Sequence, residues 1–230
     1  MFQLFSYIYR ICLWLYIILL FIIVPIFAFP FSLIMGRKRS FRLFFKLFIK
    51  LGLLILGVYP IVTGKENIPK KQKVILISNH PGFLDPFQLN AALPGFYNFI
   101  IFAKQLFNPI SMLTIINADI VARSSGHALV GAKTVRAVIE KVNKGDSFIL
   151  IPTEMVVKDG TIDKVNRSLY GIISSTEAVI LPVHISGGIS LFVPKGPLRS
   201  KIVIGKPISK NDILMGRDLF IIRTIASLKQ

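Results

Sequence analysis

Residues that bind metals or form disulfides are scarce in this sequence. It contains one cysteine, Cys12, and three histidines, whose spacings match no metal-binding motif. A single cysteine excludes an intrachain disulfide, which agrees with a reducing compartment. Because Cys12 lies within a long apolar run, catalysis by a cysteine nucleophile is also excluded. We therefore expect neither a metal site nor a metal cofactor.

Acidic residues are also scarce. The chain has 11 Asp and Glu against 28 Lys and Arg, a net charge of +17, and its first acidic residue is Glu66. A basic chain of this kind binds nucleic acid or an anionic membrane. The sequence has no zinc-finger spacing, no aromatic and basic signature of an RNA-binding sheet, and no basic recognition helix without lipid-like neighbours. The charge therefore indicates anionic phospholipids as partners and no nucleic acid.

Charge is absent altogether from residues 11–35. About 20 apolar residues in a helix are enough to cross a bilayer, so this run predicts a membrane segment. Pro25 and Pro30 interrupt the run, which leaves two alternatives open: one straight transmembrane helix, or a kinked or re-entrant pair of half-helices. A cleaved signal peptide is disfavoured, because the run is long and ends in basic residues, without a small-residue cleavage site.

A basic stripe follows this run. Cations recur every four residues at Lys38, Arg42, Lys46 and Lys50, among Phe, Leu and Ile. The spacing predicts an amphipathic helix lying in the membrane interface, with its basic stripe facing anionic headgroups. Only Arg10 precedes the apolar run, so the positive-inside rule places the rest of the chain on the cytoplasmic side, at the inner membrane if the source is bacterial.

Short apolar runs separated by Gly, Pro and Asn begin near residue 58. We therefore expect an N-terminal membrane-anchoring region at 1–57 and a catalytic domain at 58–230. Strands are predicted at 58–62, 74–78, 99–102, 119–122, 147–151, 178–185, 190–193 and 201–204, and helices at 127–143 and 211–228. This alternation predicts an α/β domain with a mixed, largely parallel sheet flanked by helices.

The most informative segment follows the apolar strand at 74–78. Asn79, His80 and a Pro-Gly pair form a turn there, and we expect Asp85 to cap the next helix. These residues could form only a well-made turn and helix start. However, the turn can also fold the Asp85 carboxylate onto one imidazole nitrogen of His80, which makes the other nitrogen a general base. Such a base needs only a substrate hydroxyl if the acyl donor is an activated thioester.

The His80 and Asp85 spacing resembles the acyltransferase family that includes the 1-acylglycerol-3-phosphate acyltransferases. Further resemblance lies in residues 102–106 around Lys104, in 120–123 ending at Arg123, in 181–183 and in 204–208, so that it covers about 58–210. It implies an α/β domain docked on a membrane by an N-terminal helical segment. In that family His80 would deprotonate the acceptor hydroxyl, Asp85 would orient His80, and Lys104 and Arg123 would hold the acceptor's phosphate, with Asn79 beside the substrate.

The third block departs from the family pattern. The family usually has Glu directly after the block's Pro, whereas this chain has Thr153 there and Glu154 one position later. Both residues stay candidates for substrate binding, and we expect Glu154 beside the pocket. Three explanations remain open: a local shift that lets Glu154 serve, an acceptor other than lysophosphatidic acid, or a weakened enzyme.

The resemblance implies transfer of a fatty acyl group from acyl-CoA or acyl carrier protein to a lysophospholipid, most simply 1-acyl-sn-glycerol 3-phosphate, giving phosphatidic acid. The alternative is a catalytically silent membrane-binding protein that keeps the fold. No cofactor beyond the acyl thioester co-substrate is implied. Residues 126–134 are a near miss to a phosphate-binding loop, because the lysine is displaced by one position.

Overall fold

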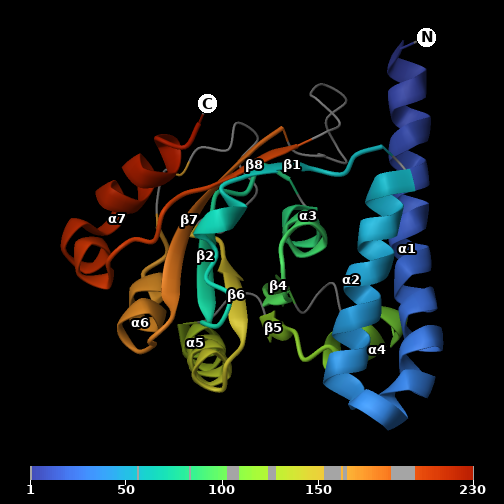
Figure 1. Cartoon of the computed structure of the whole chain (residues 1–230), viewed down its shortest axis with the longest axis horizontal. Coiled ribbons are helices and arrows are strands. Elements are labelled where there is room, and N and C mark those ends of the chain that lie inside the picture. Colours follow the sequence, from blue (N-terminus) through green and yellow to red (C-terminus); the bar gives the residue numbers. More distant parts are fainter. Residues whose placement is uncertain are drawn as a thin grey trace.

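A helical hairpin stands beside an α/β domain in this protein (Figure 1). The structure, a computed structural model, describes residues 2–55, 57–82, 84–102, 109–123, 128–152, 162, 165–187 and 200–229. The hairpin consists of α1 (Phe2–Met35) and α2 (Arg37–Ile55), which lie side by side and run in opposite directions. The remaining elements form the α/β domain.

Within the described residues the main sheet has six strands and is mixed but mostly parallel. In spatial order it contains β1 (Ile61–Thr63), β8 (Lys201–Ile204), β7 (Val179–Ser186), β2 (Val74–Ser78), β6 (Ser147–Leu150) and β3 (Tyr97–Asn98). Only the pairing of β7 with β8 is antiparallel among the pairings in this sheet. A separate parallel pair joins β4 (Ile100–Phe102) to β5 (Val121–Arg123).

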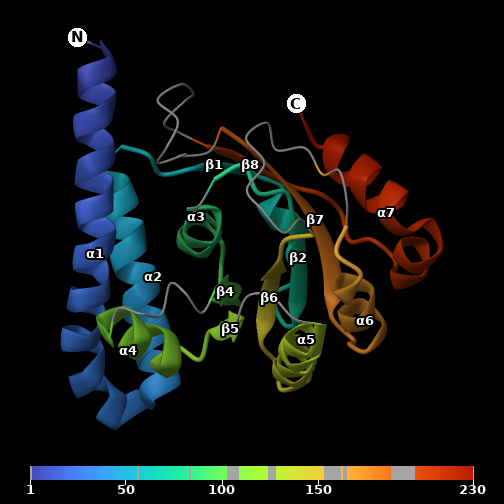
Figure 2. The same ribbon diagram turned by 180° about the vertical axis from the view of Figure 1, so that it is seen from behind.

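Helices cover both faces of the main sheet. On one face lie α5 (Ala128–Asn143), α6 (Ser168–Ser174) and α7 (Lys210–Ala226), and on the other lies α3 (Asp85–Ala92), with α2 behind it (Figures 1 and 2). Ile75 and Ile77 of β2 belong to the hydrophobic core on the side of α5, α6 and α7, while Val74 and Leu76 belong to the core on the side of α3 and α2. Because both faces of β2 are buried, its sequence is continuously apolar.

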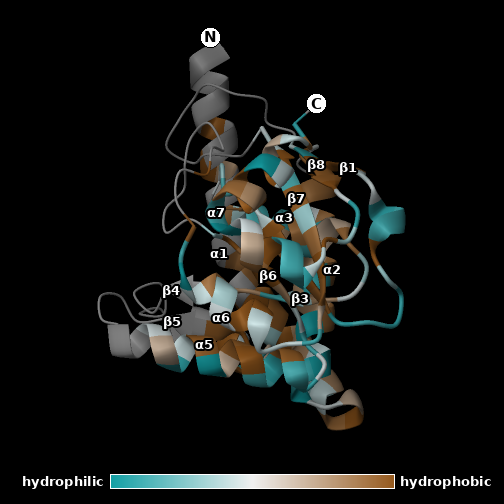
Figure 3. Ribbon diagram, turned by 90° about the vertical axis from the view of Figure 1, so that its left-hand side faces the viewer, coloured by the Kyte–Doolittle hydropathy of each residue, from teal (hydrophilic) through white to brown (hydrophobic). Residues whose placement is uncertain are grey.

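Two more of the described helices complete the fold. The single-turn 3-10 helix at Lys65–Asn67 precedes β2, and α4 (Pro109–Asn117) packs against α1 and α2 (Figure 1). Hydrophilic and hydrophobic residues are interleaved along α5 (Figure 3), as expected for a helix with one buried face.

Most predicted elements of the α/β domain are confirmed. The strands at 74–78 and 201–204 have their predicted bounds, and α5 begins one residue after its predicted start. The strand predicted at 99–102 is found as β4 (Ile100–Phe102), but β4 lies in the separate pair, and β3 (Tyr97–Asn98) is an additional strand of the main sheet that was not predicted. The strand predicted at 190–193 lies outside the described residues.

The hairpin differs from both membrane arrangements that the sequence suggested. Pro25 and Pro30 lie inside one continuous helix, so the pair of half-helices is wrong. The chain then reverses at Gly36, whose φ of 81° is a left-handed conformation that glycine adopts at little cost. The predicted transmembrane helix is also not supported, because none of the described helices combines the length and the apolarity that crossing a bilayer requires.

The orientation predicted for α2 is wrong for most of its basic stripe. Arg42 and Lys46 are partly buried and, together with the exposed Lys38, bind acidic side chains and backbone carbonyls of the α/β domain, while Lys50 is exposed as predicted. The exposed face of α2 instead carries apolar residues, which are Leu43, Leu47, Leu51 and Leu54. Helical spacing correctly grouped the cations on one stripe, but it could not show that their partners were in this chain.

Candidate active site

The candidate site lies at the carboxyl end of β2, in the middle of the main sheet. Ser78 ends this strand beside Val183 of β7, and Ile77 pairs with Leu150 of β6. His80 follows two residues later. In open sheets of this kind, ligands gather at the carboxyl ends of parallel strands, because the loops that can contact them emerge there.

His80 and Asp85 form the predicted pair. The Nδ1 atom of His80 lies 2.9 Å from Oδ2 of Asp85, and the backbone N–H of Gly82 donates to the same oxygen at 2.8 Å. The Asp85 side chain is only 1% exposed, whereas that of His80 is 16% exposed. The turn therefore buries the carboxylate and leaves the imidazole at the surface of the site.

The local reason for this geometry differs from the one predicted. Asp85 is the first residue of α3, and the N-cap is Leu84, so the carboxylate does not cap the helix. It reaches back to the N–H of Gly82 in the preceding turn. Gln88 does not complete a capping box either, because its Oε1 accepts a hydrogen bond from Ser200. Sequence reasoning missed the Gly82 contact, which a side-chain pattern does not reveal.

The N–H of Gly82 requires an acceptor at Oδ2 of Asp85, and an ionised carboxylate offers no donor, so Nδ1 of His80 meets this oxygen as the donor. Burial raises the pKa of Asp85 above its ordinary value, while the hydrogen bonds and charge of His80 and the N–H of Gly82 oppose the shift. The hydrogen-bond pattern assigns the proton of neutral His80 to Nδ1. Nε2 is then unprotonated, and it is the nitrogen that can accept a proton from a substrate.

Asn79 has a bracing role in this arrangement. Its side-chain amide donates to the carbonyl of Ile185 at 2.9 Å, and its Oδ1 accepts from the N–H of the same residue at 2.7 Å. The side chain thus continues the pairing of β2 with β7 past the end of the strand, and it is fully buried. This fixes the start of the His80 turn; contact of Asn79 with a substrate stays a prediction.

The other predicted site residues are only partly located. Arg123 ends β5 and pairs in register with Phe102 of β4, two residues before Lys104. Phe99 separates β4 from β3, and the pair of β4 with β5 is separate from the main sheet, so a position of Arg123 near His80 stays a prediction. Lys104, Thr153 and Glu154 lie outside the described residues, as does the predicted position of Glu154 beside the pocket.

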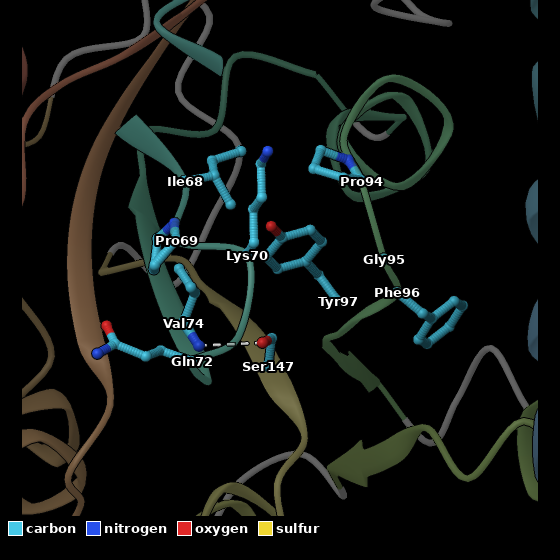
Figure 4. Close-up of a pocket in the computed structure, with 10 residues that line it drawn as sticks. All are labelled: Ile68, Pro69, Lys70, Gln72, Val74, Pro94, Gly95, Phe96, Tyr97 and Ser147. Atoms are coloured by element: carbon cyan, nitrogen blue, oxygen red, sulfur yellow. Dashed lines mark hydrogen bonds between the residues drawn. The ribbon is translucent and has the colours of Figure 1, made fainter. Parts of the chain in front are cut away.

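A cavity of about 240 Å³ lies at the opposite edge of the sheet (Figure 4). Its walls include Val74, Tyr97 and Ser147, which begin β2, β3 and β6. His80 follows the other end of β2, so this cavity is separated from the dyad by the length of a strand. Over the described ranges, no cluster of three or more His, Cys, Asp or Glu side chains could hold a metal ion.

Together, the fold and the dyad define an α/β protein with a carboxylate-oriented histidine at the carboxyl edge of its sheet. The chain belongs to the acyltransferase family, since the profile described as Acyltransferase matches residues 60–186. It is 30% identical over 154 residues to the 1-acyl-sn-glycerol-3-phosphate acyltransferase of Borreliella burgdorferi, covering 63% of this chain and 58% of that protein. This chain thus matches somewhat more than half the length of that relative.

A solved structure has the same fold. The crystal structure of the 1-acyl-sn-glycerophosphate (LPA) acyltransferase PlsC from Thermotoga maritima superposes with a TM-score of 0.75, at 21% sequence identity. The match covers 99% of this chain and 96% of that chain, so it includes the helical hairpin as well as the α/β domain. At this identity the likeness concerns the fold.

Proposed function

We propose that this protein transfers a fatty acyl group from an acyl thioester to the hydroxyl of a lysophospholipid, with 1-acyl-sn-glycerol 3-phosphate as the first acceptor to test. The observation that carries the proposal is the His80 and Asp85 pair, joined at 2.9 Å. The family of the chain and the name of its Borreliella burgdorferi relative support the choice of reaction and acceptor.

The proposed reaction begins with proton transfer to Nε2 of His80. As the acceptor hydroxyl loses its proton, its oxygen attacks the thioester carbonyl and a tetrahedral intermediate forms. The C–S bond then breaks, and the thiolate takes the proton back from the imidazolium. The products are an ester and a free thiol, and Asp85 stabilises the imidazolium in between. No nucleophile from the protein is needed, because the thioester is already activated.

The phosphate of the acceptor would be held by Lys104 and Arg123. A forked guanidinium can bind two phosphate oxygens, and an ammonium adds a compact charge. The pairing of Arg123 with Phe102 supports this proposal, because Phe102 is only two residues before Lys104 in the sequence. Thr153 and Glu154 complete the proposed binding residues, on the strength of the family's third block.

A lipid surface is the proposed location of this reaction. The hairpin exposes an apolar stripe on α1, made of Ile8, Ile11, Leu15, Leu19, Ile22 and Ile26, and the four leucines of α2. Exposed apolar surface on this scale is costly in water and is typical of a membrane or partner interface. We propose that the hairpin lies against the membrane through these residues, with the catalytic domain on the cytoplasmic side.

The test is to incubate purified protein with a labelled acyl thioester and a panel of lysolipids, using acyl-CoA and acyl carrier protein as alternative donors. Thioester loss that requires a lysolipid, with matching formation of diacyl product, supports the proposal. Lipid binding without any turnover contradicts it and supports the silent membrane-binding alternative. The ranking of acceptors also separates lysophosphatidic acid from other headgroups.

A further inference from the structure

The basic stripe of α2 forms a network with the α/β domain. Arg42 binds Asp146 with both terminal nitrogens, at 2.8 and 3.0 Å, and Lys38 contacts Asp146 and Asp119, each at 3.0 Å. Lys141 of α5 also pairs with Asp119. The sequence distance between the partners exceeds 70 residues for every contact that α2 makes here. The network therefore joins two parts of the molecule that no local structure would hold together.

Arg42 is the best-fitted member of this network. Its Nε donates to the carbonyl of Ala118 at 2.9 Å, and its guanidinium lies 4.8 Å from the ring centroid of Phe96. The side chains of Arg42 and Asp146 are only 14% and 11% exposed. A planar, forked group is needed to make these contacts at once, so lysine would not replace it. Mostly buried charges without partners are costly, which makes this pairing obligatory for the packed state.

Both acids stand where a helix end does not favour them. Asp119 follows the last turn of α4 with a φ of 61°, and Asp146 follows α5 directly after Gly145. The carboxyl end of a helix carries partial negative charge, so an acid there is unfavourable unless a cation compensates it. For Asp146 the cations of α2 supply that compensation, whereas for Asp119 Lys38 of α2 shares it with Lys141 of α5. Asp146 is therefore the acid whose stabilising effect depends on docking of α2.

A third contact ties α2 to the helix that carries the catalytic carboxylate. Lys46 donates to the carbonyls of Leu93 and Gly95, just past the carboxyl end of α3, and α3 begins with Asp85. Every residue of α3 is buried, and Phe45 of α2 packs on Phe87 of α3 with ring centroids 5.8 Å apart. Burial, with repulsion from Lys50 and Lys65, lowers the pKa of Lys46 to about 8, so this lysine is placed there at a cost.

We propose that Asp146 is a positioning residue: through Arg42 and Lys38 it clamps the lipid-facing hairpin to the catalytic domain, and so fixes the depth of the dyad relative to the membrane surface. This rests on the proposed function. An acceptor embedded in a bilayer presents its hydroxyl at a depth set by the lipid, and a misplacement of about 1 Å can cost about 100-fold in rate. A water-soluble acceptor has no such constraint.

The test compares Asp146→Asn with wild type on two acceptors. One is a long-chain lysolipid in phosphatidylcholine and phosphatidylglycerol vesicles, and the other is a six-carbon analogue used as a monomer in solution. We expect kcat on vesicles to fall about tenfold or more, kcat on the soluble acceptor to change less than about twofold, and flotation with vesicles to stay unchanged. The matched control is Glu177→Gln, which removes an exposed acid paired with Lys210 and should change neither rate.

Equal losses on both acceptors, or no loss on either, would overturn the clamp. If Asp146→Asn does not fold, the double variant Arg42→Gln with Asp146→Asn leaves neither partner charge uncompensated and is measured in the same way. A wild-type protein inactive on both acceptors would contradict the proposed function and not the clamp. In that case the clamp is tested by the distance between two spin labels, one attached to Cys12 and the other to the cysteine of Asp212→Cys. Their distance distribution should be narrow in the otherwise wild-type chain and broad with Asp146→Asn, and an unchanged distribution would overturn it.

Discussion

Replacing Asp85 with Asn separates the charge of this residue from its hydrogen-bonding geometry. The N–H of Gly82 requires an acceptor at the position of Oδ2, so the amide oxygen should take that place and still accept from Nδ1 of His80. The tautomer of His80 is then preserved. What the variant lacks is the negative charge that stabilises the imidazolium formed when the acceptor hydroxyl is deprotonated.

The expected loss follows from Coulomb's law. Two unit charges about 4 Å apart attract by about 4 kcal/mol at the effective dielectric constant of a protein, of about 20. At about 1.4 kcal/mol per tenfold, this corresponds to a fall in kcat of up to about 1000-fold. The amide nitrogen would occupy the position of Oδ1, which is buried and has no hydrogen-bond partner among the described residues. That costs about 1 to 3 kcal/mol of stability, partly offset by removal of a buried charge.

The assay is the initial rate of thioester consumption at saturating lysolipid, with the melting temperature as a check of folding. Asp218→Asn is the matched control, because Asp218 accepts a hydrogen bond from the Tyr170 hydroxyl between α6 and α7 and does not contact His80. It should keep the wild-type rate. If folded Asp85→Asn protein retained kcat within about tenfold of wild type, the proposed role of the Asp85 charge would be refuted.

Three further predictions concern the hairpin. Hydrogen bonds and charge from Arg42 and Lys38 outweigh the effect of burial and lower the pKa of Asp146 to about 2. The ionised Asp146 should therefore stabilise the folded protein by about 1 to 2 kcal/mol above pH 4, and this contribution should be lost between about pH 4 and 2. The measurement is the difference in unfolding free energy between wild type and Asp146→Asn, which should shrink as the pH falls. Gly52→Ala should lower the unfolding free energy by about 1 to 3 kcal/mol, measured by urea denaturation, because a Cβ there overlaps the Tyr16 ring. Leu47→Glu should leave the melting temperature nearly unchanged but weaken vesicle flotation about tenfold, since Leu47 is 42% exposed on the proposed lipid face.

Each of these three predictions about the hairpin has an outcome that would contradict it. A constant stability difference down to pH 2 would mean that Asp146 is not held ionised by its partners. An unchanged unfolding free energy for Gly52→Ala would mean that α1 and α2 pack less closely at Tyr16. Undiminished flotation of Leu47→Glu would place the lipid contact elsewhere.

The dyad and the central strands were predictable because their signals are local. The strand at 74–78 is buried on both faces and therefore almost entirely apolar, and a turn with a sequence separation of 5 is enough to bring Asp85 to His80. The same locality explains α5, whose apolar stripe ends at the Gly145 turn. These features need no knowledge of the rest of the chain.

Features that depend on distant partners were not predictable. The stripe of Lys38, Arg42 and Lys46 looks identical on a helical wheel whether it faces headgroups or protein, and its acidic partners lie far along the chain. The placement of residues 97–98 in the main sheet and of 100–102 in a separate pair depends on which strands β3 and β4 meet. The pattern around Asp85 fits an N-cap, but the carboxylate is held by His80 and Gly82 instead.

The most direct test of the account is the amount of free thiol and diacyl product formed by wild-type protein and by His80→Ala, with an acyl thioester and a lysolipid. The account predicts one thiol per ester formed by the wild type, only when the lysolipid is present, and a rate lowered by about 100-fold to 10,000-fold in the variant. Full acyl transfer by folded His80→Ala protein would contradict it.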